Sequence, residues 1–166
     1  IVASGPLGGT RIGGSGTFSI ITKGALTNGA TASQANGLFG AYLKFSGYDG
    51  IIVQGAAKRW LYLYINDGKI ELREASHLLG KDTHEVVNLL SKELGKEDRQ
   101  LSVVCIGPAG EHLVRFAGVI ADKAHSASHN GLGAVMGSKN LKAIAASRGS
   151  KTVMVKDPDR LAKVAE

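Results

Sequence analysis

The sequence predicts an α+β fold of two similar half-domains whose β-sheets are related by a pseudo-two-fold axis. The order strand, Gly-Pro turn, strand, polar loop, Asn-Gly-Leu, helix, strand occurs twice, near residues 1–55 and near residues 101–149. The two Asn-Gly-Leu triplets begin at Asn36 and Asn130. One pattern repeated in the same order is the signature of a duplicated unit. The alternative is chance similarity in a chain with 23 glycines.

The first half alternates apolar segments with polar, glycine-rich ones, which predicts strands separated by loops. A helix is expected directly after Asn36-Gly37-Leu38. In order, we expect a strand at residues 1–4, a flexible loop at 5–17, a strand at 18–23, a second polar loop at 24–36 and, after the helix, a strand at 51–54.

The middle of the chain predicts a hairpin and a helix inserted between the halves. Strands at residues 60–65 and 69–73 are separated by Asp67-Gly68, a strong hairpin signal. Asp82 followed by Glu85 is typical of a capping box, so a helix is expected to begin there and end near Gly95.

The second half repeats the first. Strands are expected at residues 103–106, 116–121 and 141–146. A short helix at residues 134–136 is expected to stop at Asn140, which tolerates a left-handed backbone. We expect a domain at residues 1–150, and in residues 151–166 the start of a linker and helix that lead to further domains.

Composition and charge limit the function classes. Of 166 residues, 43% are hydrophobic and 20% are charged, as in a globular domain, and no apolar run approaches the roughly 18 residues of a membrane helix. The net charge of +6 is scattered and only 5% of residues are aromatic, so nucleic acid is not the expected partner. The single cysteine, Cys105, lies in an apolar strand, which favours a core position and a cytoplasmic location.

The two Asn-Gly turns carry the predicted chemistry. A glycine turn that opens a helix directs several backbone N–H groups at one spot and attracts anions, phosphate above all. Two such turns across a pseudo-two-fold axis suit a ligand with a phosphate at each end. The spacing of His125 and His129 would also suit zinc, but no third ligand is evident, so donation to an anion is favoured. The residues leave open a stand-alone phosphate-binding module and a basic nucleic-acid module.

Four segments resemble the N-terminal domain of the aldehyde ferredoxin oxidoreductase family: residues 5–7, 39–50, 106–111 and 133–144. The resemblance covers essentially the whole chain. It implies a bis-pyranopterin cofactor with tungsten or molybdenum (tungstopterin), whose two phosphates are bridged by magnesium. It also implies an anaerobic oxidoreductase that interconverts aldehydes and carboxylic acids, with ferredoxin or another electron carrier as partner.

The resemblance assigns site residues by position. Gln34 and Ser126 stand where the family supplies backbone carbonyls to magnesium. The expected cofactor-binding set comprises Thr17, Gln34, Ala35, Asn36, Gly37, His125, Ser126, Ala127, Ser128, His129, Asn130 and Gly131.

The sequence departs from the aldehyde enzymes inside this set. Thr17, His125 and His129 stand where those enzymes use arginine, and Gln34 replaces an asparagine. These departures are similar to the tungsten subunit of class II benzoyl-coenzyme A reductase, a branch whose substrate is an acyl-coenzyme A. In either branch the 4Fe-4S cysteines and the catalytic acids lie in later domains, so this chain alone is expected to be inactive. A homodimer remains open.

Overall fold

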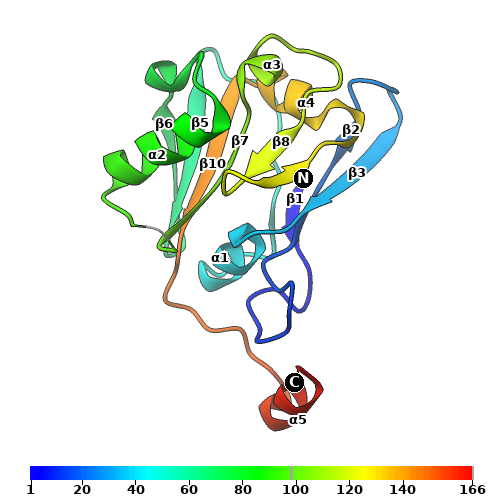
Figure 1. Ribbon diagram of the computed structural model, residues 1–166, viewed down its shortest axis with the longest axis vertical. Coiled ribbons are helices and arrows are strands. Elements are labelled where there is room, and N and C mark those ends of the chain that lie inside the picture. The colour runs from blue at the N-terminus through cyan, green and yellow to red at the C-terminus, as the bar shows by residue number, and fades with distance from the viewer. Residues whose placement is uncertain (98, 166) are drawn as a thin grey trace.

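The computed structural model describes residues 1–97 and 99–165 and contains two β-sheets with helices packed between and around them (Figure 1). The first sheet has the strand order β3-β2-β1-β4, and every pairing in it is antiparallel. Its strands are β1 (Val2–Ser4), β2 (Phe18–Lys23), β3 (Ala30–Ala35) and β4 (Gly50–Ile51).

The second sheet has six strands in the order β6-β5-β10-β7-β8-β9. In the part of the chain that the structure describes, the β10–β5 pair is parallel and the other pairs of this sheet are antiparallel; β5 and β6 form a hairpin added to the edge of β10. The strands are β5 (Leu61–Asn66), β6 (Lys69–Glu74), β7 (Leu101–Cys105), β8 (Val119–Ala121), β9 (His125–Ala127) and β10 (Leu141–Ser147).

The two sheets share one topology, which confirms the duplicated fold class. The order β3-β2-β1-β4 corresponds strand by strand to β9-β8-β7-β10, with antiparallel pairing throughout. The helix before the last strand also corresponds: α1 (Phe39–Phe45) precedes β4, and α4 (Leu132–Ser138) precedes β10. The axis relating the halves and the boundary near residue 150 stay predictions.

The main core lies between the two sheets. Helix α1 contacts β1, β7 and β10, and α4 contacts β2 and β10, so each helix packs against both sheets. Phe18 and Phe39 meet edge to face with ring centroids 5.2 Å apart, and both are fully buried. Such burial is worth roughly 2–3 kcal/mol for each aromatic side chain.

The inserted hairpin and helix α2 (Thr83–Leu94) form a second core on the other face of the second sheet. The capping box is present, since Asp82 accepts from the Glu85 amide and Glu85 accepts from the Asp82 amide. The helix ends at Gly95, as predicted, and Gly95 has a left-handed backbone. The hairpin turn at Asp67-Gly68 is also confirmed, with φ of 49° and 87°.

Two predicted loops contain strands. The sequence predicts a polar loop at residues 24–36, but Ala30–Ala35 form β3, whose residues alternate exposed and buried. His125–Ala127, predicted to lie in a loop, form β9. Small and polar side chains conceal the strand pattern, and pairing with β2 and β8 overrides their weak propensity.

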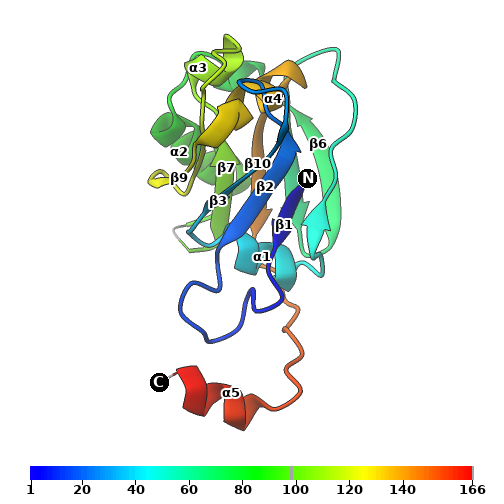
Figure 2. The ribbon, with the colours of Figure 1, turned by 90° about the vertical axis from the view of Figure 1, so that its right-hand side faces the viewer.

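Other boundaries shift. The strands expected at residues 51–54 and 116–121 are shorter, and α4 is longer than the three residues predicted. The sequence does not predict the short helical segments η1 (Ser76–Leu78), α3 (Pro108–Glu111) and η2 (His129–Gly131). Helix α5 (Pro158–Ala165) stands apart from both sheets (Figure 2). Among the described residues, no helix is long and apolar enough to cross a membrane.

Candidate functional site

The predicted site residues come together where the two sheets meet. β3 is the edge strand of the first sheet and β9 the edge strand of the second, and the two strands are in contact. Residues 34–37 and 125–131, about ninety positions apart in the sequence, are therefore brought to one place. We call this place the facing edges.

The backbone N–H and C=O groups of Gln34 point away from β2, off the edge of the first sheet. Ile21 exchanges both of its backbone hydrogen bonds with Ile1, at 2.9 Å each, so its N–H and C=O face β1. Ser19, two residues away in the same strand, faces β1 as well, and its partner in β3 is Gln34. Because antiparallel pairs alternate between bonded and non-bonded, the Ser19–Gln34 pair is non-bonded, and the Gln34 carbonyl points away from β2.

The same reasoning applies to Ser126 in the second sheet. The Asp122 amide donates to the Val103 carbonyl at 2.9 Å, so the main chain of Asp122 faces β7. Ile120 therefore also faces β7, and its partner in β9 is Ser126. The Ser126 carbonyl consequently points away from β8. Gln34 and Ser126 thus hold equivalent positions in the two halves, each with a carbonyl directed off an open sheet edge.

The two halves show the same pattern of side-chain burial next to these carbonyls. Gln34 and Ser126 are exposed, whereas the next residues, Ala35 and Ala127, are buried. The exposed positions leave room for a ligand over the facing edges. Carbonyl oxygens are suitable ligands for a hard cation such as magnesium, which retains several waters or phosphate oxygens beside its protein ligands.

The turn in the first half is already engaged by a carboxylate. Gly37 has φ of 105°, and the amide of Leu38, the N-cap residue directly before α1, donates to Oδ2 of Asp122 at 2.8 Å. A Cβ on Gly37 would lie 2.6 Å from that oxygen and 3.1 Å from Cδ2 of His125. The sequence predicts that the turn offers its amides to a ligand anion, and one of them, the Leu38 amide, is instead used within the protein.

The turn in the second half has a different environment. Asn130 and Gly131 both adopt left-handed backbones, with φ of 60° and 75°. The Asn130 amide group donates to the Thr31 hydroxyl at 2.6 Å, which joins this turn to β3. A Cβ on Gly131 would overlap the carbonyl oxygen of Arg115, so packing alone requires glycine there. The two Asn-Gly turns therefore differ in backbone, since Asn130 has a positive φ and Asn36 does not, and they also differ in partners.

The glycine-rich loop after β1 borders the site. A hollow of about 300 Å³ lies beneath it, and Thr17 and Gln34 are among the residues that line it. The Thr17 hydroxyl donates to Oδ1 of Asn36 at 3.0 Å. This bond orients a pair of polar side chains at the end of β3, next to the open edge.

The remaining predicted residues complete the surface of the site. His125 is half-buried, and Ser128 and His129 are exposed. Of the described residues, no three His, Cys, Asp or Glu side chains gather in a way that could hold a metal ion. Main-chain oxygens are the metal ligands that this region offers.

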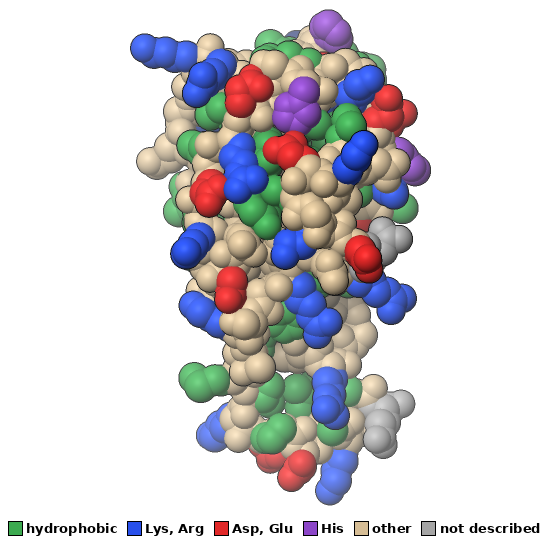
Figure 3. Space-filling model, turned by 90° about the vertical axis from the view of Figure 1, so that its left-hand side faces the viewer, with side chains coloured by type: hydrophobic (Ala, Val, Ile, Leu, Met, Phe, Trp, Pro, Cys, Tyr) green, Lys and Arg blue, Asp and Glu red, His purple; other side chains and the backbone are tan. Residues whose placement is uncertain are grey.

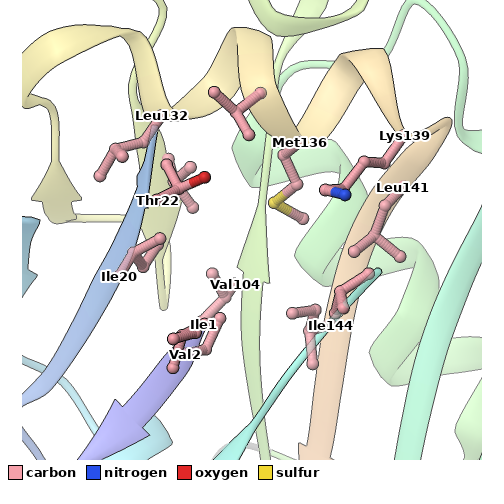
Figure 4. Close-up of a pocket in the computed structure, with 13 residues that line it drawn as sticks. Ile1, Val2, Ile20, Thr22, Val104, Leu132, Met136, Lys139, Leu141 and Ile144 are labelled. Atoms are coloured by element: carbon pink, nitrogen blue, oxygen red, sulfur yellow. The ribbon is translucent and has the colours of Figure 1, made fainter. Parts of the chain in front are cut away.

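A second cavity lies between the sheets and is apolar. Its volume is about 130 Å³, and Ile20, Val104, Leu132 and Met136 lie around it (Figure 4). The ammonium group of Lys139, on its rim, is bonded to the Gly55 carbonyl at 2.9 Å. Such a lining does not suit a doubly phosphorylated ligand.

On the face shown in Figure 3, basic and acidic side chains are interspersed over the surface. Cys105 is buried, and its burial raises the pKa of the thiol to about 12. This confirms its position in the core.

Asp122 is absent from the residues predicted for the site, because a single acidic residue after a strand carries no pattern.

Known proteins resemble this chain over nearly its whole length. Residues 1–148 match the family model described as "Aldehyde ferredoxin oxidoreductase, N-terminal domain". The chain is 48% identical over 160 residues to a "Tungsten-containing aldehyde ferredoxin oxidoreductase" of Pyrococcus furiosus, which covers 96% of this chain and 26% of the relative. It is 36% identical over 171 residues to an "Aliphatic sulfonate oxidoreductase, WOR-like subunit" of the same organism, with 97% and 27% covered.

One solved structure is similar over nearly the whole chain. It is the "Active site complex BamBC of Benzoyl Coenzyme A reductase in complex with 1,5 Dienoyl-CoA". The TM-score is 0.93 at 38% sequence identity, over 99% of this chain and 24% of that one. The chain therefore spans about a quarter of the length of the relatives that it matches.

Proposed function

The chain belongs to the aldehyde ferredoxin oxidoreductase family, in its N-terminal domain, and on this premise we propose that it binds the tungstopterin cofactor of an oxidoreductase. Its relatives include tungsten-containing oxidoreductases and a subunit complex of benzoyl-coenzyme A reductase. The facing edges support the way in which the cofactor would be held. The relatives support the proposed reaction and the proposed partners.

The observation that carries the proposal is the pair of outward carbonyls. Gln34 and Ser126 lie at equivalent positions of the duplicated fold, on edges that contact each other. A magnesium ion held by these two oxygens would lie on the boundary between the halves. Such an ion would still need further ligands, and the oxygens of a ligand with two phosphates would supply them.

The other predicted residues would contact the rest of the cofactor. Thr17 with Asn36 in the first half, and Ser128 with His129 in the second, present hydroxyl, amide and imidazole groups beside the edges. None of these side chains carries the fixed charge of the arginines that the resemblance implies. At Thr17, for example, a hydroxyl donor would replace a guanidinium, so a contact to an uncharged part of the pterin would lose its charge-assisted character.

The proposed reaction is the interconversion of aldehydes and carboxylic acids, with ferredoxin or another electron carrier as partner. When bound, the tungsten or molybdenum supplies the redox step, whereas this domain supplies position and hydrogen bonds. A 4Fe-4S cluster would be ligated by later domains, since a cluster usually takes four cysteine thiolates and this chain has one cysteine. That single buried cysteine also supports a cytoplasmic location.

A second candidate is the corresponding domain of a class II benzoyl-coenzyme A reductase-type subunit. The TM-score of 0.93 over 99% of the chain favours it. The aldehyde candidate is supported by the 48% identity to the enzyme of Pyrococcus furiosus. The two candidates share the cofactor and differ in substrate, so the binding proposal is common to both.

The test is elemental and pterin analysis of the full-length protein purified without oxygen. We expect one tungsten or molybdenum, two pterins and one magnesium per chain. Turnover of aldehydes with ferredoxin, compared with turnover of benzoyl-coenzyme A, then separates the two candidates. A protein that binds phosphate compounds but contains neither metal nor pterin would contradict the proposal and favour a non-redox phosphate-binding module.

A further inference from the structure

Asp122 lies outside every segment that the sequence assigned to the site, yet its carboxylate joins the two halves. Oδ1 accepts hydrogen bonds from the Ser102 hydroxyl at 2.7 Å and from the Val103 amide at 3.0 Å, both in β7. Oδ2 accepts from the amide of Leu38, 84 residues away, at 2.8 Å. One half-buried side chain thus connects β7 of the second half to the start of α1 in the first.

This connection acts on a turn that borders the facing edges. Gly37 lies against the Asp122 carboxylate, since a Cβ at that position would be 2.6 Å from Oδ2. The turn follows β3 directly, so its position limits where the end of β3 and the Gln34 carbonyl lie. His125 of β9 lies close to the same glycine, because that Cβ would also be 3.1 Å from its ring. The carboxylate therefore supports a turn that residues of both halves surround.

The role of Asp122 is that of an internal anion. An amide at the beginning of a helix is a donor without an intrahelical partner, and a carboxylate satisfies it well. At the first turn the protein supplies this carboxylate itself. We propose that Asp122 is a positioning residue. It holds residues 36–38 against β7 and thereby fixes how β3 lies relative to β9 at the facing edges, where the cofactor would bind. The effect on cofactor binding rests on the proposed function.

The first measurement is amide hydrogen exchange by mass spectrometry in the full-length protein. Asp122→Asn keeps the shape but loses the charge and replaces one of the two accepting oxygens with an NH₂ donor, and Asp122→Ala removes the side chain. In both variants we expect exchange in peptides covering residues 36–40 to rise by at least roughly tenfold, because a hydrogen bond to a charged group is lost. Peptides covering residues 141–147 should stay within about twofold of wild type.

Ser102→Ala is the matched control. It removes one donor to Oδ1 but leaves the Leu38 bond in place, so exchange at residues 36–40 should rise less than about threefold. Unchanged exchange at residues 36–40 in both Asp122 variants would overturn the proposal. An equal rise at residues 141–147, or failure of both variants to fold, would also overturn it, since Asp122 would then stabilise the domain as a whole.

The second measurement is the electron paramagnetic resonance spectrum of the tungsten(V) state, with tungsten content per chain. We expect Asp122→Asn to change the spectrum or lower the tungsten content at least about threefold, and Ser102→Ala to change neither. If Asp122→Asn raises amide exchange at residues 36–40 but keeps the wild-type tungsten(V) spectrum and tungsten content, the proposed effect of Asp122 on the cofactor is overturned. Wild-type protein that contains no tungsten would count against the proposed function alone. The role of Asp122 at residues 36–38 is tested separately, because amide exchange does not depend on bound tungsten.

Discussion

Gly40 and Gly133 occupy equivalent positions in the two halves. The amide of Gly40 donates to the Gly16 carbonyl at 2.9 Å, and the amide of Gly133 donates to the Ala117 carbonyl at 2.8 Å. A Cβ on Gly40 would overlap the carbonyl oxygen of Thr17, and one on Gly133 would overlap that of Gly118. In each half the helix thus packs directly on the residues that lead into the second strand.

Alanine at either glycine should therefore destabilise the protein. We expect Gly40→Ala and Gly133→Ala each to lower the free energy of unfolding by about 2–3 kcal/mol, because backbone must move to admit the methyl group. Gly29→Ala, in an exposed turn where the nearest atom would be 3.7 Å away, should stay within about 0.5 kcal/mol of wild type. Denaturant unfolding measures all three. Equal stability of Gly40→Ala and Gly29→Ala would contradict the packing argument.

The buried pair of Lys142 and Glu111 should be sensitive to loss of one partner. The Lys142 side chain is fully buried, contacts Glu111 and also donates to the carbonyls of Ile106 at 2.7 Å and Lys81 at 3.0 Å. Lys142→Met leaves a carboxylate without its partner, and we expect a loss of about 3–5 kcal/mol. Thermal and denaturant unfolding of the full-length protein report this loss.

A double variant separates pairing from packing. Glu111→Gln in the Lys142→Met background should recover about 1–3 kcal/mol of the loss, because a neutral amide is cheaper to bury than an unpaired carboxylate. As a matched surface control, Glu71→Gln removes an exposed partner of Arg73 and should cost less than about 1 kcal/mol. Additive effects of the two buried substitutions would show that the pair is not coupled.

Cys105 should resist alkylation in the folded protein. Burial raises the pKa of its thiol to about 12, so the reactive thiolate is scarce at pH 8.5, where an ordinary cysteine is about half ionised. This raised pKa favours the folded state below the ordinary thiol pKa, and the advantage is lost as pH rises toward 12. Iodoacetamide labelling of the peptide that contains Cys105 should be at least about a hundredfold slower in native than in denatured protein. Similar rates in the two states would refute it.

Magnesium retention should tolerate changes of the side chains at its proposed ligands. Gln34→Ala and Ser126→Ala keep the outward carbonyls, so magnesium and tungsten per chain should stay within about twofold of wild type. Asn36→Ala removes a side chain beside the edge and should weaken cofactor retention more than either. Metal analysis after gel filtration provides the comparison. Loss of magnesium in Gln34→Ala would indicate side-chain ligation instead.

The sequence predicted the elements with strong local signals. Asp82 with Glu85 marked the start of α2, Gly95 its end, and Asp67-Gly68 the hairpin turn, because each signal lies in a few adjacent residues. It failed for β3 and β9. Alanine and serine make up most of both strands and do not favour a strand, so pairing with neighbouring strands had to create it.

The sequence by itself determined the duplicated order of elements, the family resemblance and the two segments that carry the site. Only the tertiary structure decided that these segments meet at facing edges, and that Gln34 and Ser126 direct their carbonyls outward. The direction of each carbonyl follows from how its strand pairs with the neighbouring strand, and the sequence of one strand does not specify that pairing. Only the fold could show that Asp122 occupies the Leu38 amide, because that contact joins residues 84 positions apart through packing of the two halves.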